Sequence, residues 1–195
     1  MFNDRYGLTK AVIEGRKTMT RRLVPWALTE QWMGFVSDAP SVGGVYVHES
    51  EKEFYEREAP RYKVGDVVAV AQSYRDVCAS CFEPNAAILR LFEDQRLASW
   101  SNKMFVKAEL MPHQIRITGI KCERLYDISE EDCMKEGILG DVEYDKYEVY
   151  GLFGNSDDGF DTPREAFASL IDKVSGRGTW KRNPWVVAYE FELVK

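Results

Sequence analysis

The run Glu14–Arg22 constrains the fold more than any other stretch, because it joins a predicted helix to a predicted strand. Residues 7–14 carry apolar side chains at helical spacing, and Gly15 can end that helix. Residues 18–24 then predict a strand that is closed by the proline at the next position. We therefore expect the chain to turn sharply near Gly15 before it enters a sheet.

The same run is strongly basic and contains two hydroxyl groups. Thr18 and Thr20 lie among its charges, and Glu14 is the one acidic residue between positions 10 and 22. The cationic residues are Lys10, Arg16, Lys17, Arg21 and Arg22. Such a cluster suits a polyanion or a polar nucleotide. A solvated helix C-terminus has a similar composition, because cations favour the helix dipole there, so charge alone leaves both interpretations open.

The order of the residues favours the first interpretation. The pattern Gly15-x-Lys17-x-x-Thr20-x-Arg22 resembles the G-x-K-x-x-[ET]-x-R signature of ASCH domains, which are small β-barrel proteins related to the RNA-binding PUA domains. Further segments resemble the same family in the same order, namely Lys63–Val68, Leu125–Ile138 and Asn183–Phe191. Together these segments span most of the chain.

The resemblance implies one α+β domain over residues 1–195, built on a PUA-like mixed, mostly antiparallel β-barrel with helices at its ends. Residues 26–60 and 78–103 look like insertions into that barrel. A chain of 195 residues is long enough for one domain with a sizeable core. Apolar patterning predicts further strands at 67–74, 88–92, 103–106, 115–125 (with a bulge at 118–119) and 185–194, further helices at 129–136 and 162–174, and a polar connection at 141–161.

One branch of the family, the bacterial N4-acetylcytidine amidohydrolases, gives the resemblance a chemical meaning. These enzymes carry a Lys-Thr-x-Thr motif, which Lys17-Thr18-Met19-Thr20 matches, and a catalytic glutamate in a segment that places it at Glu136. The resemblance implies that Lys17 accepts a proton, Thr20 is the nucleophile and Glu136 donates a proton. No cofactor is required for this chemistry.

The residue types are suited to amide hydrolysis, which needs a nucleophile, a base and an acid for the leaving amine. Lys17 can act as the base only if burial or neighbouring cations lower its pKa. Successive strand residues point to opposite faces, so Lys17 and Thr20 can reach one ligand only if the chain turns or bulges between Gly15 and Met19. The residues expected to contact the ligand are Gly15, Arg16, Thr18, Arg21 and Arg22.

Two other functions fit the same pattern. A non-catalytic module could bind a modified nucleoside or single-stranded RNA, with the cations on phosphate and an aromatic ring on a base. Trp180 or Trp185 could supply that ring, although aromatic residues beside a terminal strand also build cores. A phage- or prophage-linked accessory protein that acts through a protein partner is the third reading.

Net charge and apolar patterning limit the partners and the cellular location that we expect. The formal net charge of -6 argues against indiscriminate binding to duplex nucleic acid. No apolar run approaches the length of a membrane span, and the N-terminal residues do not resemble a signal peptide. We therefore expect a cytoplasmic protein with no membrane partner.

The cysteines raise the question of a metal. Cys78 and Cys81 form a C-x-x-C pair, which can ligate zinc or act as a redox couple. A zinc site would need two more ligands, for which Cys122, Cys133 and His113 are the candidates. Their spacing fits no common zinc module, so we expect thiols and no bound metal.

Overall fold

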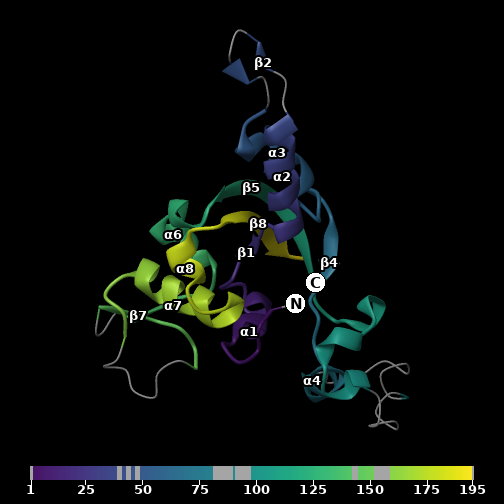
Figure 1. The fold of residues 1–195 in the computed structure, drawn as a ribbon. Helices are drawn as coiled ribbons and strands as arrows, with labels where there is room; N and C mark the ends of the chain where they lie inside the picture. The colour runs from purple at the N-terminus through teal and green to yellow at the C-terminus, as the bar shows by residue number, and fades with distance from the viewer. Residues whose placement is uncertain are drawn as a thin grey trace.

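The protein is an α+β structure built around a curled antiparallel sheet. The computed structural model describes residues 2–38, 41–42, 45–46, 49–80, 90, 98–141, 145–151 and 159–194. The main sheet has the strand order β1-β8-β5-β4, and each of its neighbouring pairs is antiparallel. Its strands are β1 (Met19–Leu23), β4 (Val67–Ala69), β5 (Gln114–Arg124) and β8 (Trp185–Leu193). Figure 1 shows the long strands β5 and β8 curving together over the centre of the molecule.

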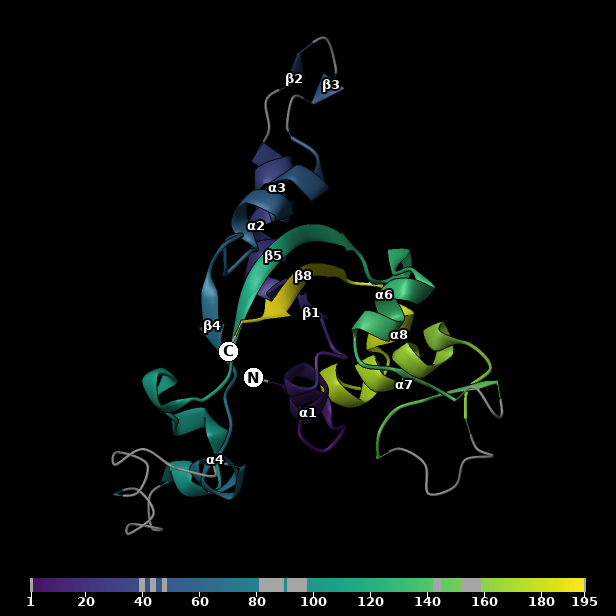
Figure 2. The same ribbon diagram turned by 180° about the vertical axis from the view of Figure 1, so that it is seen from behind.

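Helices gather at one end of the curved sheet, and a second group projects from it (Figures 1 and 2). The helices are α1 (Leu8–Ile13), α2 (Trp26–Asp38), α3 (Glu51–Glu58), α4 (Tyr74–Ser80), α6 (Glu130–Lys135), α7 (Pro163–Ser175) and α8 (Thr179–Arg182). Short 3-10 turns are η1 (Ala98–Trp100), η2 (Lys103–Phe105), η3 (Ala108–Leu110) and η4 (Leu125–Asp127). Two small strand pairs join β2 (Ser41–Val42) to β3 (Val45–Tyr46) and β6 (Leu139–Asp141) to β7 (Lys146–Glu148).

The bulge predicted at residues 118–119 is present in β5. The β5–β8 register shifts between Ile117 and Gly119, while β1 pairs with β8 in unbroken register from Met19 to Leu23. A Cβ at Gly119 would lie 2.9 Å from the Glu190 carboxylate, so the lack of a side chain permits this close approach. The extra residue bends the strand and strengthens the curl of the sheet.

The two predicted C-terminal-half helices form as expected, because each has a side-chain cap. The Thr162 hydroxyl accepts a hydrogen bond from the Glu165 backbone N–H at 3.1 Å, and Pro163 occupies the first position of α7. The Ser129 hydroxyl likewise accepts from the Asp132 N–H at 3.1 Å and begins α6. The buried stripe of α7 faces the core and consists of Ala166, Phe167, Leu170 and Ile171.

One predicted strand is shorter than expected, and another is absent. The strand expected at 67–74 is present as β4 over Val67–Ala69 only, and its predicted end is helical instead, because the Ser73 hydroxyl accepts from the Asp76 N–H at 3.2 Å at the start of α4. The strand expected at 103–106 is instead the turn η2, which the Asn102 side chain caps. The polar connection expected at 141–161 contains strand β7. The strand expected at 88–92 lies outside the described residues except for residue 90.

Most of the segment expected to be an insertion at 26–60 forms a projection from the sheet (Figure 1). Helices α2 and α3 run along it, and the β2–β3 hairpin lies at its tip. Trp32 of α2 packs on Phe54 of α3 with ring centroids 5.4 Å apart. Much of the second expected insertion, 78–103, lies outside the described residues.

The packing of α7 against the core gives a first prediction. Phe167 is almost fully buried, so Phe167→Ala should lower the free energy of unfolding by about 3–5 kcal/mol through lost burial and the cavity left behind. Chemical denaturation followed by circular dichroism measures this. Val174→Ala is the matched control, because Val174 lies on the same helix and is 38% exposed. An equal loss in both variants would contradict the described orientation of α7.

Candidate functional site

A turn between α1 and β1 brings the basic run against helix α6. Gly15 has φ +73, a backbone conformation that glycine adopts without strain. The Lys17 N–H then donates to the Ala11 carbonyl at 2.9 Å, and the Thr18 N–H donates to the Lys135 carbonyl at 2.9 Å. The turn expected near Gly15 is therefore present, and it carries Lys17 to the C-terminal end of α6.

Lys17 and Glu136 form a buried pair. The Lys17 Nζ lies 2.5 Å from Glu136 Oε2 and 2.7 Å from the Glu136 backbone carbonyl oxygen. The two side chains are 1% and 6% exposed. Burial lowers the pKa of Lys17 below its ordinary value; Glu136 opposes this effect, whereas Arg22 and Arg21 reinforce it. The direction of this shift is the one that a lysine base requires.

Arg21 holds three carboxylates at once. Its side chain is fully buried, and its Nη2 atom lies 2.6 Å from Glu123 Oε1 and 2.8 Å from Asp132 Oδ2. Its Nη1 atom lies 3.2 Å from Glu136 Oε1, so Glu136 receives one cation on each carboxylate oxygen. Arg21 therefore contacts the carboxylate oxygen of Glu136 that Lys17 does not contact, and so fixes the orientation of the glutamate.

The network continues from Arg21 to the surface. The Lys121 Nζ, on β5, lies 2.8 Å from Asp132 Oδ2 and 3.1 Å from Glu123 Oε2. Burial alone would raise the pKa of Asp132, but hydrogen bonds from Lys121 and Arg21 outweigh it and lower that pKa. The carboxylate of Asp132 is thus held in its charged form between two cations.

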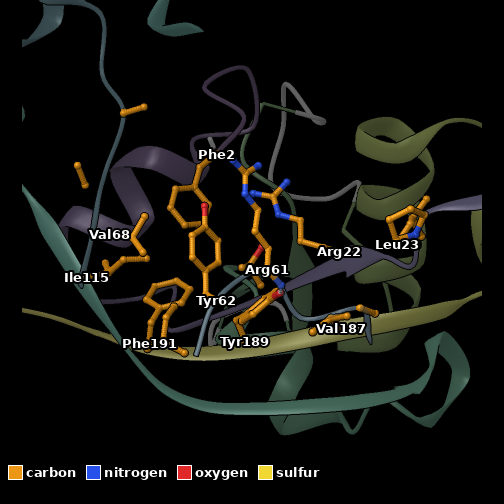
Figure 3. A pocket seen from close by; sticks show the side chains of 16 residues that line it. Phe2, Arg22, Leu23, Arg61, Tyr62, Val68, Ile115, Val187, Tyr189 and Phe191 are labelled. Carbon is orange, nitrogen blue, oxygen red and sulfur yellow. Dashed lines mark hydrogen bonds between the residues drawn. The ribbon is translucent and has the colours of Figure 1, made fainter. Parts of the chain in front are cut away.

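Two adjoining pockets open beside this network. The first, here called the inner chamber, has a volume of about 170 Å³ and is lined by Lys17, Thr20, Arg21, Arg22 and Glu136 together with Phe2 and apolar residues of α7. The second, here called the sheet pocket, has a volume of about 380 Å³ and covers the concave face of β1, β8 and β5 (Figure 3). Phe2, Thr20, Arg22 and Leu23 line both pockets.

Thr20 stands where the two pockets meet. It is half-buried, and no described residue forms a hydrogen bond with its hydroxyl. Within the described part of the chain, the hydrogen bonds of Lys17 Nζ both go to Glu136. The three residues expected to be catalytic, Lys17, Thr20 and Glu136, therefore line one chamber, with the Thr20 hydroxyl open to a ligand.

The residues expected to bind a ligand are divided between several places. Arg22 is exposed and lines both pockets, whereas Arg21 is buried in the carboxylate network. Gly15 and Arg16 lie in an exposed turn, and the Arg16 Nη2 atom lies 2.6 Å from a Glu14 carboxylate oxygen. Thr18 is half-buried, and its backbone pairs with α6 and β8. Among these five, only Arg21 and Arg22 belong to the described pocket walls.

The cysteines do not form a described metal site. Cys78 is half-buried, and Cys81 lies outside the described residues. Burial raises the pKa of Cys122 to about 11 and that of Cys133 to about 12, so both remain protonated thiols. Within the described ranges, no cluster of three or more His, Cys, Asp or Glu side chains is arranged to hold a metal. His113 is half-buried and is not part of the described wall of either pocket.

Both tryptophans proposed as stacking platforms are packed against neighbouring side chains. Trp180 lies 4.9 Å from the Tyr126 ring between centroids, and Trp185 lies 5.7 Å from the Tyr55 ring. The interpretation that these residues help to build the core therefore fits both tryptophans. The aromatic rings that line the sheet pocket belong instead to Phe2, Tyr62, Tyr189 and Phe191.

Sequence reasoning identified Glu136 but missed the two other carboxylates that contact Arg21, Glu123 and Asp132. One signal was available, because Asp132 and Glu136 are four residues apart and so share one face of α6. Glu123 gave no comparable signal. It meets Arg21 only because β8 lies between β1 and β5 in the sheet.

Comparisons with known proteins assign no family to this chain. The chain matched no protein-family model, no curated protein and no solved structure. Among the described helices, none has the length and apolar character needed to cross a membrane.

The Arg21 network gives a second prediction. Arg21→Met should lower the free energy of unfolding by about 3–5 kcal/mol, because three buried carboxylates lose their shared cation. Arg16→Met should have little effect, since Arg16 is exposed. Denaturant titrations of both variants at neutral pH test this, and a loss in Arg16→Met as large as that in Arg21→Met would contradict it.

The effect of Arg21→Met should also depend on pH. The pKa of Asp132 is lower in the folded protein than its ordinary value of 3.8, so its contribution to stability is present above that value. This contribution is lost as pH falls through the folded-state pKa. The stability gap between wild type and Arg21→Met should therefore shrink below pH 3.8, and a gap that widens in acid would overturn the assignment.

Proposed function

We propose that this protein hydrolyses the amide of N4-acetylcytidine or a related acylated nucleoside. The observation that carries the proposal is the buried Lys17–Glu136 pair at 2.5 Å, in a chamber that Thr20 also lines. Base, acid and nucleophile are the groups that acyl transfer from an amide requires. The resemblance of residues 15–22 and 125–138 to ASCH amidohydrolases supports the same roles, and the curled antiparallel sheet is compatible with a PUA-like barrel.

The pair can reach its reactive form without exchanging a proton with solvent. Transfer of one proton from Lys17 Nζ to Glu136 Oε2 converts an ion pair into a neutral amine and a carboxylic acid. The neutral pair has the same total number of protons as the ion pair, so the transfer needs no proton from solvent. Lys17 then has a free electron pair, and Glu136 has a proton to donate.

The reaction then follows in balanced steps. The Thr20 oxygen attacks the amide carbonyl carbon while Lys17 takes the hydroxyl proton, which gives a tetrahedral intermediate. Glu136 donates its proton to the leaving nitrogen as the carbon–nitrogen bond breaks, releasing cytidine and leaving an acetyl ester on Thr20. Water hydrolyses that ester to acetate and restores the hydroxyl group.

The surrounding arginines have separate tasks in this scheme. Arg22 lines the chamber beside Thr20, where its guanidinium can stabilise the developing oxyanion. Arg21 contacts the carboxylate oxygen of Glu136 that Lys17 does not use, and so keeps Glu136 directed toward Lys17. Arg21 is thus a positioning residue that does not meet the substrate in this scheme.

The test is incubation with N4-acetylcytidine and chromatographic measurement of cytidine. Lys17→Met, Thr20→Val and Glu136→Gln should each reduce the rate by about 100-fold or more, because each removes one participant in acyl transfer. Lys10→Met is the matched control, since Lys10 is an exposed lysine of α1. It should retain full activity, and circular dichroism should show that every variant is folded.

Two results would contradict the proposal. A folded wild-type protein that forms no cytidine would exclude this substrate. Activity that survives both Lys17→Met and Thr20→Val would exclude this mechanism. In the first case a non-catalytic nucleotide-binding module becomes the leading account, and binding that weakens with salt and with Arg22→Ala would support it.

A further inference from the structure

The inner chamber has an apolar wall that the proposed reaction does not use. Helix α7 forms most of this wall, and Leu8 of α1 adds to it. The α7 residues that line the chamber with apolar side chains are Phe167, Leu170, Ile171 and Val174. The reacting groups of the chamber therefore lie beside a surface that suits a hydrocarbon group.

The apolar wall is long and narrow. Its four α7 residues recur at helical spacing, so they lie along one face of the helix. From position 167 to position 174 the helix rises about 10 Å, at about 1.5 Å per residue. Phe167 is almost fully buried and Val174 is partly exposed, so the wall runs from the interior toward the surface. A wall of this shape favours a linear chain.

The buried polar groups of the chamber are already engaged with one another. Lys17 Nζ lies 2.5 Å from one carboxylate oxygen of Glu136, and Arg21 Nη1 lies 3.2 Å from the other. The remaining polar side chains of the lining are half-buried or exposed and belong to Asn3, Thr20, Arg22 and Ser175. Water against the α7 wall would find few partners there, so an apolar occupant is favoured in its place.

The volume of the chamber exceeds what an acetyl group needs. It is about 170 Å³. An apolar cavity of about 150 Å³ lined by Leu, Ile and Phe is large enough to bind benzene. An acetyl group carries only a methyl beyond its carbonyl carbon, and it would leave most of the α7 wall uncovered. By the same comparison, a chain of about four to six carbons fills the chamber.

The cytidine part of the substrate has a separate place. The sheet pocket has a volume of about 380 Å³, against about 170 Å³ for the inner chamber, and Thr20 lines both. A carbonyl carbon at the Thr20 hydroxyl can therefore carry its chain into the chamber and its nitrogen substituent toward the sheet pocket. Tyr62 and Tyr189 line that pocket and meet edge to face at 5.7 Å between centroids (Figure 3). The Arg61 N–H donates to the Tyr189 hydroxyl at 2.8 Å and fixes this aromatic wall, which suits a planar ring.

We propose that the inner chamber is an acyl-binding site, and that the preferred substrate carries a linear acyl group of about four to six carbons in place of acetyl. This inference rests on the proposed hydrolysis, because the hydrolysis places the carbonyl carbon at Thr20. The steps of the reaction are unchanged. Thr20 carries the longer acyl ester, and water releases the corresponding carboxylic acid. The face of α7 thus sets the preferred acyl length.

The first experiment compares kcat/KM for N4-acetylcytidine and N4-butyrylcytidine. The wild type should favour the butyryl substrate by about tenfold, because its additional methylene groups leave water. Val174→Phe should abolish this preference, because the added ring occupies the chamber from its exposed end. Lys173→Phe is the matched control, since Lys173 is the exposed neighbour on α7 and is not among the described lining residues. It should keep the wild-type ratio.

A second variant tests the same wall by enlarging the chamber. Val174→Ala removes side-chain volume at the exposed end, so longer chains should gain. The ratio of kcat/KM for N4-hexanoylcytidine to that for N4-butyrylcytidine should rise about threefold. Circular dichroism should show that each variant is folded. An unchanged ratio in folded Val174→Ala would overturn the assignment of the α7 wall.

A third experiment measures binding without turnover. N4-ethylcytidine and N4-butylcytidine lack the carbonyl group, so neither offers an amide to hydrolyse. Isothermal titration calorimetry should show about tenfold tighter binding of N4-butylcytidine to the wild type. The preference should disappear in Val174→Phe and persist in Lys173→Phe.

The three experiments distinguish failure of the acyl site from failure of the hydrolysis. Hydrolysis of N4-acetylcytidine with no gain for the butyryl substrate, together with equal affinities for the two alkylated cytidines, would overturn the acyl site alone. Tighter binding of N4-butylcytidine without turnover of any amide would support the acyl site and overturn the hydrolysis. A chain-length preference that survives in folded Val174→Phe would contradict the position given to the acyl chain.

Discussion

The buried guanidinium of Arg21 is the interaction on which the rest of the site depends. It joins Glu123 of β5, Asp132 of α6 and Glu136 at the end of α6 to strand β1. Transfer of these charges out of water is costly, and only a complete set of hydrogen bonds offsets that cost. The strand order and the position of α6 are therefore coupled to the geometry of a single side chain.

This coupling determines the charge balance around Lys17. Arg21 already contacts Glu136, so the Lys17–Glu136 pair does not depend on Lys17 alone for neutralisation. A second cation beside the glutamate also repels the charge of Lys17 and reinforces the lowering of its pKa by burial. The same arrangement therefore stabilises the fold and, in the proposed reaction, prepares a lysine for proton transfer, with Thr20 at the neighbouring wall as the proposed nucleophile.

Local signals in the sequence were sufficient for part of the fold and of the site. Helix α7 was predictable because Thr162 and Pro163 begin it and its apolar stripe is regular. The turn at Gly15 was predictable, because Lys17 and Thr20 could contact the same ligand only if the chain turned between Gly15 and Met19. Longer-range features were not predictable, because Glu123 meets Arg21, and Arg61 meets Tyr189, only through the tertiary arrangement of the sheet.

The charge state of Lys17 tests the account most directly. Nuclear magnetic resonance of the Lys17 Nζ, assigned by comparison with Lys17→Met, can follow its titration in the wild type and in Glu136→Gln. The account predicts a pKa below the ordinary 10.5 in the wild type and a lower one in Glu136→Gln, because the variant loses the charge that opposes the effect of burial. A wild-type pKa at or above 10.5 would mean that Lys17 is an ordinary structural cation, and would contradict its role as the base.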